Sequence, residues 1–576
     1  MRASAMPRTA LPWPFVVAFL GCSSTTVTPP VPDASTDVVD AARPDVADAA
    51  DVADAASECD PPAPNDPLVA RTDRGLVRGT ADGESLRWLG IPFAEPPTGA
   101  RRWRPPEPVA ACWAEPRAAT DWAPSCPQIP QQQGVAFDPM APMQGQEDCL
   151  TLNVWRPANA PANAELPVMV FVHGGGNVVG SAGETNATGA RIYDASRLAS
   201  RGNVVVVTIQ YRLGPLGWLV HPALEAEPGG AVNLALLDQI AALRWVQRNA
   251  RAFRGDPARV TLFGESAGAV NTCALLASPQ AAGLFARAAV ESGSCIAVQT
   301  IADARAQGQR FAAAASCGTG ADAAQCLRAL PVDAALRALP APVSIAGLDG
   351  AMTARWGPVV AAPTLPERPY DAMLAGRQNR VPLIVGHNTE EVGLSVGAVP
   401  TEEAYRQILV NAGGAMFATN VMTLYPVSRF GTPRAALVQA LTDARFGCQA
   451  RASARAHLRG GGAVWRYLFA QPLESSTATV RALGAWHGLE LAYVFQNLNR
   501  LPTPAANDLA VERSVLGFWT RFAATGSPEG GGDMWPAYGS GEPLLRIQPT
   551  LAVERNWRNT ECDGWDRVIM VMPPAP

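Results

Sequence analysis

The chain has 576 residues, of which 48% are hydrophobic and 17% are charged, and its formal net charge is −5. A hydrophobic fraction of this size excludes a mostly disordered chain, and a nearly neutral, slightly acidic balance argues against a nucleic-acid-binding protein. No run approaches the ~18 consecutive apolar residues of a membrane-spanning helix, so the sequence does not predict a helical membrane bundle.

The first 21 residues are typical of an export signal. Arg2 and Arg8 precede a short apolar stretch at 11–20, which is the order of the charged and apolar regions of a secretory signal peptide. The stretch is too short for a membrane helix and contains two prolines. We therefore predict a signal peptide over 1–21.

A candidate lipid-attachment site follows directly. The sequence Gly-Cys-Ser-Ser at 21–24 resembles a bacterial lipobox, in which Cys22 becomes the lipid-bearing first residue. Phe19 departs from the small aliphatic residue that is usual there. The alternative is ordinary signal cleavage between 18 and 24, which would give an exported protein without a lipid.

Residues 22–60 are predicted to be a linker behind that anchor. The segment is rich in Pro, Thr, Ala, Asp and Val, and residues 45–56 are one acidic hexapeptide, Asp-Val-Ala-Asp-Ala-Ala, repeated twice. Such a composition buries too little apolar surface to offset the entropy of ordering, and its charges repel one another. A short acidic helix is the alternative. The folded domain is then expected over 61–576.

Alternating strands and helices begin after the linker and an irregular region. Strands are predicted at 167–172 and 204–213, and a helix at 236–253. The first strand is followed by His173 and three glycines, 174–176. Glycines in a row expose backbone N–H groups without obstruction by Cβ, as an oxyanion hole requires. The alternative interpretation, a flexible turn, does not explain the place of this loop one strand and helix before the next motif.

The next motif is a nucleophile elbow. A strand at 259–263 leads into Gly-Glu-Ser-Ala-Gly at 264–268, and a helix is predicted at 269–277. A G-x-S-x-G sequence between strand and helix projects its serine, here Ser266, out of the sheet and places it at the positive end of a helix. A second copy at 393–397 does not lie between a strand and a helix, and we interpret it as chance.

A serine nucleophile needs a base, and the chain has five histidines. His173 belongs to the glycine loop and is expected to hold it. His221 precedes the elbow, against the order Ser, acid, His. His387 precedes the expected acid, and His457 lies on a helix predicted to be exposed. His487, in a Gly-flanked loop far downstream, is the remaining candidate.

The acid is expected between the serine and the histidine, on a loop after a strand. The strand predicted at 381–385 is followed by Gly-His-Asn-Thr-Glu-Glu at 386–391. Glu390 and Glu391 are adjacent and point in different directions, so only one of them can meet an imidazole.

Without Cys22, ten of the 11 cysteines remain. An even number in an exported chain predicts disulfides, and buried thiols are the alternative. Cys317 and Cys326 are close enough to clip a short loop, but the sequence alone does not determine the pairing. The CxxC pairs of a structural zinc site do not occur, so no metal is predicted.

These motifs resemble the type-B carboxylesterases, the branch of the α/β-hydrolases that includes cholinesterases and some lipases, over about residues 66–565. The matching segments are 147–155, 211–214, 238–239, 255–257, 263–268 and 535–538. The resemblance implies the fold class α/β: an α/β-hydrolase fold with a mostly parallel central sheet, helices on both faces, and large loop and helix insertions over the active site.

The resemblance also implies roles for particular residues. The catalytic residues correspond to Ser266, Glu391 and His487, and the oxyanion donors to Gly175, Gly176 and Ala267. The family's disulfides correspond to Cys126–Cys149, Cys317–Cys326 and Cys448–Cys562. The pairs 59–112 and 273–295 are assigned by proximity along the chain alone.

The expected activity is hydrolysis of a small carboxylic ester through an acyl-serine, without a metal or an organic cofactor. No nucleic acid is expected as a partner, and the membrane is contacted only through the lipid anchor. The expected location is the outer membrane or cell surface, and otherwise the periplasm or the medium. A catalytically silent adhesion domain is the alternative, disfavoured because every motif of the site is present. Lipase, lactonase and amidase activities, and the oligomeric state, are left open.

Some positions depart from the family's pattern. Asn177 replaces an aromatic residue after the glycines, and 355–362 lacks the usual Asp-Gly. The 126–149 loop contains no Trp, which disfavours choline esters because an indole would hold the quaternary ammonium. Glu265 beside the nucleophile is expected either to set the local field or to hold the elbow.

Overall fold

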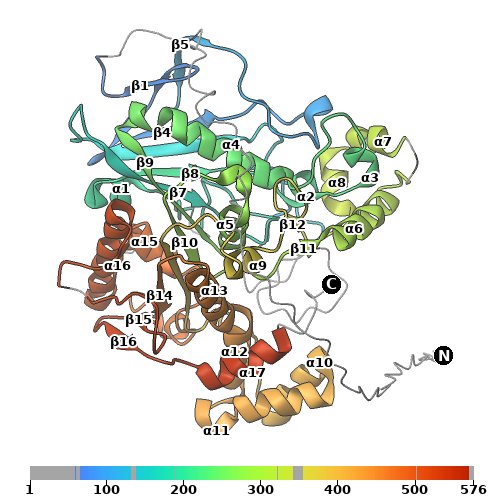
Figure 1. Ribbon diagram of the computed structural model, residues 1–576, viewed down its shortest axis with the longest axis vertical. Helices are drawn as coiled ribbons and strands as arrows, with labels where there is room; N and C mark the ends of the chain where they lie inside the picture. Colours follow the sequence, from blue (N-terminus) through green and yellow to red (C-terminus); the bar gives the residue numbers. More distant parts are fainter. Residues whose placement is uncertain are drawn as a thin grey trace, which may run out of the picture. The chain divides into compact units, whose positions relative to one another are not determined.

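The structure is a computed structural model in which a large mixed sheet lies between two layers of helices (Figure 1). The described residues belong to one compact unit, Ser57–Pro576. The predicted signal peptide, Cys22 and the linker, apart from Cys59, lie outside them. The structure describes residues 59, 65–131, 138–186, 189–318, 320, 322–341, 355–500, 503–532 and 534–569.

The central sheet has 11 strands in the order β16-β15-β14-β13-β10-β9-β7-β8-β6-β4-β3. The strands from β15 to β8 in this order run parallel, and the strands at both edges pair antiparallel. The predicted α/β-hydrolase architecture is thus confirmed. In chain order the bounds are β3 Thr80–Asp82, β4 Ser85–Pro92, β6 Thr151–Pro157, β7 Leu166–Val172, β8 Val205–Ile209, β9 Gly255–Glu265, β10 Arg287–Glu291, β13 Leu383–Asn388, β14 Val464–Phe469, β15 Leu544–Ile547 and β16 Ala552–Glu554.

Two small sheets and the helices complete the fold. The small sheets are β1 Val69–Thr72, β2 Gly75–Arg78 with β5 Trp113–Ala118, and β11 Gln299–Thr300 with β12 Val359–Val360. The α-helices are α1 Ser196–Gly202, α2 Gly214–Trp218, α3 Pro222–Glu225, α4 Leu234–Asn249, α5 Ala267–Ala277, α6 Ile301–Ala314, α7 Ala323–Ala329, α8 Val332–Ala338, α9 Pro369–Leu374, α10 Glu402–Leu424, α11 Val427–Phe430, α12 Pro433–Thr442, α13 Cys448–Arg459, α14 Ala478–Arg481, α15 Glu490–Val494, α16 Ala506–Thr525 and α17 Asn559–Ile569. Short 3₁₀ or π turns are η2 Gly99–Arg101, η3 Ala250–Phe253, η4 Pro279–Ala281, η5 Asp443–Gly447 and η6 Asn497–Arg500.

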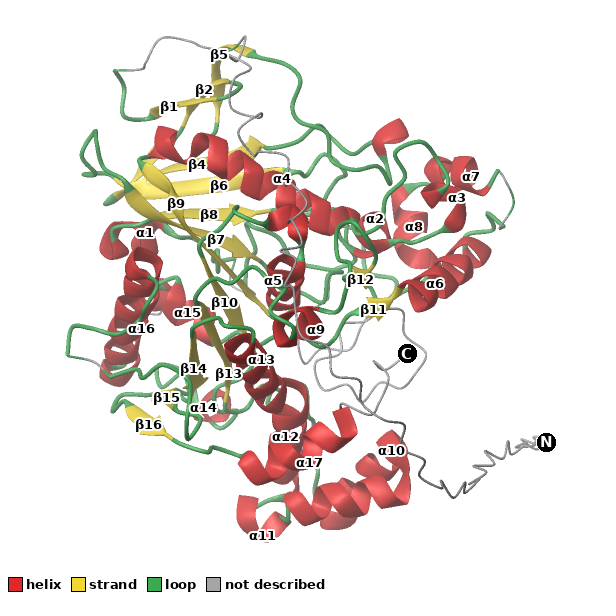
Figure 2. Ribbon diagram, in the orientation of Figure 1, coloured by secondary structure: helices red, strands yellow, loops and turns green. Residues whose placement is uncertain are grey.

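The central strands are apolar on both faces because helices cover both (Figure 2). In β7, Val168, Val170 and Val172 belong to the core that contains α4 and α5. Their neighbours Met169 and Phe171 point the other way, into the core formed with α1 and α16. Since a continuous apolar run is what a strand buried on two faces requires, the sequence signal for β7 and its tertiary setting agree.

Predicted element boundaries were less accurate than the elements themselves. The strand predicted at 204–213 is shorter, Val205–Ile209, and the backbone then turns towards α2. There Arg212 forms a buried bidentate ion pair with Asp238 of α4, with nitrogen–oxygen distances of 2.7 and 2.8 Å. The apolar run therefore continues past the end of the strand, into residues that pack outside the sheet.

The prediction of disulfide bonds is confirmed, and these bonds indicate a protein that folds outside the cytoplasm. The bonded pairs are Cys59–Cys112, Cys126–Cys149, Cys273–Cys295, Cys317–Cys326 and Cys448–Cys562. In the described part of the chain, no helix is long and apolar enough to cross a lipid bilayer.

Candidate active site

Ser266 occupies a strained turn between β9 and α5. Its backbone dihedrals are φ 56° and ψ −122°, a conformation that costs energy for a residue with a side chain and that occurs mostly at functional sites. Its N–H donates to the Glu291 carbonyl of β10 at 3.0 Å. A Cβ on Gly268 would lie 2.0 Å from the Val172 carbonyl oxygen. The second glycine of the motif is therefore needed for close packing of α5 against β7.

The glycine loop passes directly over this serine. A Cβ on Gly174 would lie 3.0 Å from Cβ of Ser266, so the backbone approaches this serine as closely as packing allows. Gly175 and Gly176 have φ values of 102° and 62°, which glycine adopts readily. Ala267 is the first residue of α5, and its N–H therefore has no acceptor within the helix. The glycine loop and the first residue of α5 thus both present backbone N–H donors near Ser266.

The side chain of His173 supports the glycine loop. Its ring stacks on Tyr211 with 4.4 Å between centroids, and the Tyr211 hydroxyl donates to the His173 carbonyl at 2.7 Å. Burial lowers the pKa of the imidazole to about 4, so the ring is neutral, and Nδ1 lies 2.9 Å from the Gly174 carbonyl oxygen. These contacts place His173 where it holds the glycine loop.

Glu391 and His487 meet across 96 residues of sequence. Glu391 Oε2 lies 2.6 Å from His487 Nδ1, and its Oε1 accepts from the Asn388 N–H at 2.7 Å. A backbone bond from His487 N–H to the Glu391 carbonyl, 3.1 Å long, fixes the two loops to each other. Glu391 is fully buried and His487 is 7% exposed. This arrangement locks one side of the imidazole to a carboxylate.

Glu390 has a different partner. Its Oε2 accepts from the Ala485 N–H at 2.8 Å and from the Thr389 hydroxyl at 2.5 Å, so it holds the loop in front of the histidine. The second G-x-S-x-G sequence, 393–397, lies in the turns that follow. Arg434 of α12 donates to the carbonyl groups of two of its residues, which indicates a structural role for that segment.

Four buried glutamates surround the imidazole and the turn below it. They are Glu265, Glu291, Glu391 and Glu490, and none is more than 4% exposed. Burial raises the pKa of Glu291 to about 8, although its Oε1 accepts from Trp519 Nε1 at 2.6 Å. Burial also raises the pKa of Glu490 well above its usual value, with nearby carboxylates adding to the effect. Carboxyl groups that are shielded from water are costly to ionise, and neighbouring carboxylates increase that cost.

The second ring nitrogen of His487 faces one of these carboxylates. His487 Nε2 lies 3.1 Å from Glu265 Oε1 and has no hydrogen-bond partner among the described residues. Burial alone would lower the pKa of His487, but the charges of Glu265 and Glu391 outweigh it and raise the pKa to about 9. Burial raises the pKa of Glu265 to about 7, against the opposing effect of His487. The imidazolium is thus strongly favoured by the two carboxylates on either side.

The other histidines are not in this site, and one differs from its prediction. His457 was expected to be exposed, but its side chain is fully buried and Nε2 lies 2.8 Å from the Val381 carbonyl oxygen. The exposure was mispredicted because α13 packs against β13 and β14. His221 caps the N-terminus of α3 by accepting from the Ala223 N–H, and His387 is buried within β13.

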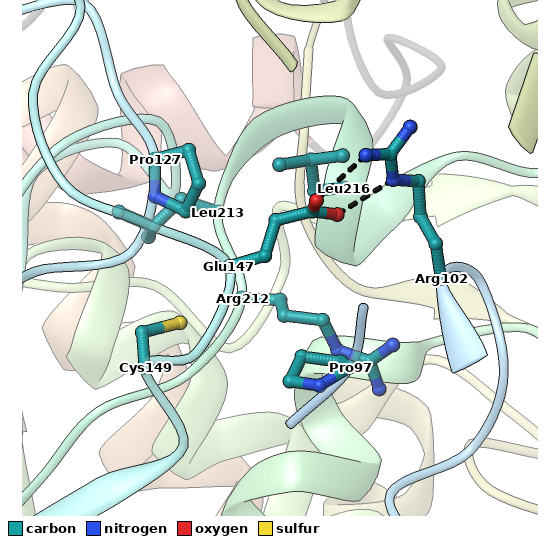
Figure 3. Close-up of a pocket in the computed structure, with 8 residues that line it drawn as sticks. All are labelled: Pro97, Arg102, Pro127, Glu147, Cys149, Arg212, Leu213 and Leu216. Atoms are coloured by element: carbon teal, nitrogen blue, oxygen red, sulfur yellow. Dashed lines mark hydrogen bonds and ion pairs between the residues drawn. The ribbon is translucent and has the colours of Figure 1, made fainter. Parts of the chain in front are cut away.

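Several matching family segments have structural roles instead. Arg102 donates to both oxygens of Glu147 at 2.6 Å, and the two side chains line a small pocket that does not contain Ser266, Glu391 or His487 (Figure 3). Arg212 lines the same pocket and holds Asp238. Within the described residues, no group of three or more His, Cys, Asp or Glu side chains is arranged to hold a metal ion.

Fold and site together define a serine hydrolase of the α/β-hydrolase fold. A model of the carboxylesterase family matches residues 66–565. The para-nitrobenzyl esterase of Bacillus subtilis is 34% identical over 482 residues, 82% of this chain and 92% of that protein, and carboxylesterase 1C of Rattus norvegicus is 32% identical over 546 residues, 89% and 95% of the two chains. A solved PNB esterase structure superposes with a TM-score of 0.72 at 32% identity, over 87% of this chain and 100% of that one. The chain belongs to the carboxylesterase family, type B, and cleaves carboxylic esters.

Proposed function

We propose that Ser266, His487 and Glu391 are the catalytic triad of this esterase, with Gly175, Gly176 and Ala267 as its oxyanion donors. The observation that carries the proposal is the 2.6 Å contact between Glu391 Oε2 and His487 Nδ1. In the neutral imidazole this contact keeps the proton on Nδ1, which leaves Nε2 as the atom that can accept a proton.

In the first half-reaction, His487 Nε2 takes the proton of the Ser266 hydroxyl as its oxygen attacks the ester carbonyl. Glu391 holds the ring in the required tautomer and stabilises the imidazolium that forms. The carbonyl oxygen becomes an oxyanion under the glycine loop, where each backbone donor is worth about 3 kcal/mol in the transition state. His487 then gives its proton to the leaving alcohol, and an acyl-serine remains.

In the second half-reaction, water replaces the alcohol. His487 takes one proton from the water, whose oxygen attacks the acyl carbonyl, and the same donors stabilise the second oxyanion. Collapse of this intermediate breaks the bond to the Ser266 oxygen, which recovers its proton from His487. The carboxylic acid leaves and the site returns to its starting state.

Replacement of the proposed nucleophile tests this assignment. Ser266→Ala should lower kcat for p-nitrophenyl acetate by a factor of roughly 10⁶, because the covalent intermediate cannot form. Ser395→Ala, in the second G-x-S-x-G sequence, is the matched control and should keep full activity. An organophosphate should label the tryptic peptide that contains Ser266. Retention of most activity by Ser266→Ala would exclude this nucleophile.

We further propose that the protein is an exported bacterial member of the cholinesterase-like branch, with one catalytic domain over 61–576. The signal at 1–21 and the lipid on Cys22 would place it at the outer membrane or cell surface, tethered by residues 22–60. The five disulfides support an oxidising compartment. Mass spectrometry of the mature N-terminal peptide tests the anchor: a diacylated Cys22 supports it, and an unmodified terminus between 18 and 24 contradicts it.

A further inference from the structure

The proposed oxyanion donors come from two separate elements of the fold. Gly175 and Gly176 lie on the loop after β7, whereas Ala267 opens α5. The distance between these donors therefore depends on how the loop is held against the helix. Because an oxyanion is stabilised only by donors that are already in position, a contact that joins loop to helix would bear directly on the reaction.

Asn177 provides such a contact. It follows Gly176 in the sequence, has φ 60°, and is 4% exposed. Asparagine is one of the few residues with a side chain that adopts this left-handed conformation readily. Its backbone carbonyl accepts from the Gly214 N–H at 2.6 Å, and its side-chain Oδ1 accepts from Asn271 Nδ2 at 2.9 Å. The backbone carbonyl and the side-chain oxygen of Asn177 are thus both hydrogen-bonded.

Asn271 belongs to the helix that begins at the nucleophile. It lies five residues after Ser266 on α5 and is fully buried. In the described part of the chain, Asn271 Oδ1 has no hydrogen-bond partner. The side-chain hydrogen bond of this buried amide is therefore the one that its Nδ2 donates to Asn177. Loss of that bond would leave polar groups unsatisfied in a water-excluded site, which a packed interior does not tolerate well.

A third segment confines the Asn177 amide. A Cβ on Gly357 would lie 3.2 Å from Asn177 Nδ2, so the backbone at Gly357 passes close to the side chain. The amide is therefore bounded by α5 and by the bend just before β12. A side chain held in this way has few alternative rotamers, and it transmits the position of α5 to the loop.

We propose that Asn177 and Asn271 are positioning residues for ester hydrolysis, forming an amide clamp that sets the oxyanion loop against the nucleophile helix. This inference rests on the proposed function, since it acts through Gly175, Gly176 and Ala267. The donors engage an oxyanion that exists only after attack, so a displaced loop weakens transition-state binding and leaves ground-state binding largely intact. The clamp should therefore affect kcat and hardly affect KM.

Two single variants and their combination test the clamp. Asn177→Ala and Asn271→Leu each remove the 2.9 Å bond from one side. Each should lower kcat for p-nitrophenyl acetate by about 10- to 100-fold and change KM by no more than about twofold. This fall in kcat is no larger than the fall expected when one oxyanion donor is removed. Affinity for a trifluoromethyl ketone, which mimics the tetrahedral intermediate, should fall by the same factor. Because both changes break one bond, the double variant should be no slower than the slower single variant.

The controls separate the clamp from general destabilisation and from the proposed function. Rates are expressed per active serine, titrated with diethyl p-nitrophenyl phosphate, so misfolded protein does not contribute. Asn249→Ala is the matched control: Asn249 is 2% exposed and joins α4 to Asp73 by side-chain bonds of 2.8 and 3.0 Å, and its loss should lower Tm and leave kcat unchanged. If Asn177→Ala does not fold, Asn271→Leu carries the test.

Three results would overturn the clamp. These are a kcat within twofold of the parent for the single variants, a rise in KM alone, or losses that multiply in the double variant. If Ser266→Ala is inactive while the asparagine variants are fully active, only the clamp is wrong. If Ser266→Ala stays active, the proposed function itself fails, whatever the asparagine variants do.

Discussion

The contact between Glu391 and His487 gives the sharpest prediction about proton transfer. Glu391 Oε1 accepts from the Asn388 backbone N–H at 2.7 Å, while Oε2 faces His487 Nδ1 at 2.6 Å. In Glu391→Gln the side-chain oxygen must remain at the Asn388 N–H, because an NH₂ group there would face another donor. The NH₂ group is then directed at Nδ1.

The consequence is a change of tautomer. An NH₂ group can only donate, so Nδ1 of His487 must accept and its proton moves to Nε2. A protonated Nε2 cannot take the proton of Ser266. We expect kcat to fall by about 10⁴-fold, the loss expected when a triad carboxylate is replaced by its amide, which equals about 5.5 kcal/mol at about 1.36 kcal/mol for each factor of ten. The fold should be retained, since the amide has the shape of the carboxylate.

The assay is hydrolysis of p-nitrophenyl acetate, with active serines titrated by an organophosphate and Tm measured in parallel. Glu390→Gln is the matched control, because Glu390 bonds to Ala485 and Thr389 instead of the imidazole, and its kcat should stay within about tenfold of the parent. A Glu391→Gln variant that retains more than a tenth of the activity would refute the reasoning. So would equal losses from the two glutamine variants.

Two further predictions concern charge and stability. His487, with its pKa raised to about 9, is protonated below that pH, so activity should rise as the pH approaches 9. Glu265→Gln removes a carboxylate 3.1 Å from Nε2, and it should shift the acid limb of the kcat/KM profile to lower pH by about one unit or more. A shift to higher pH would contradict the assignment. Loss of Cys448–Cys562, which spans 114 residues, should destabilise the fold by about 5 kcal/mol, against about 3 kcal/mol for Cys317–Cys326, which spans 9. Urea unfolding of the paired Cys→Ser variants measures both, and the reverse order would show that chain entropy does not dominate.

The elements around the proposed active site could be predicted because their signals are local. The strand before the glycine loop, the turn at 264–268 and the helix after it are each specified by neighbouring residues, and the structure has them as β7, the elbow and α5. A local backbone requirement restricts which residue can occupy a position: at Gly268 the close approach of the Val172 carbonyl oxygen leaves room only for glycine. The end of β8 was less predictable, because the residues after Ile209 stay buried outside the sheet, with Arg212 bonded to Asp238 of α4.

Side-chain choices that depend on distant neighbours needed the tertiary structure. From the residues alone, Glu390 and Glu391 were equivalent, and the resemblance to a family was needed to choose between them; in the structure each has its own partner on the 485–487 loop. The burial of His457 and the crowding of four glutamates around the turn follow from packing between elements far apart in sequence.

The difference between the features that could be predicted and those that could not has one physical reason. Backbone conformation over a few residues is decided by sterics and short-range hydrogen bonds, so the sequence by itself determined the turn at 264–268 and the glycine loop. Burial, charge coupling and the bond between Asn177 and Asn271 arise only when separate elements pack together. Tertiary structure was therefore needed to show that Glu265 and Glu391 both face the imidazole and that Asn177 on the glycine loop bonds to α5.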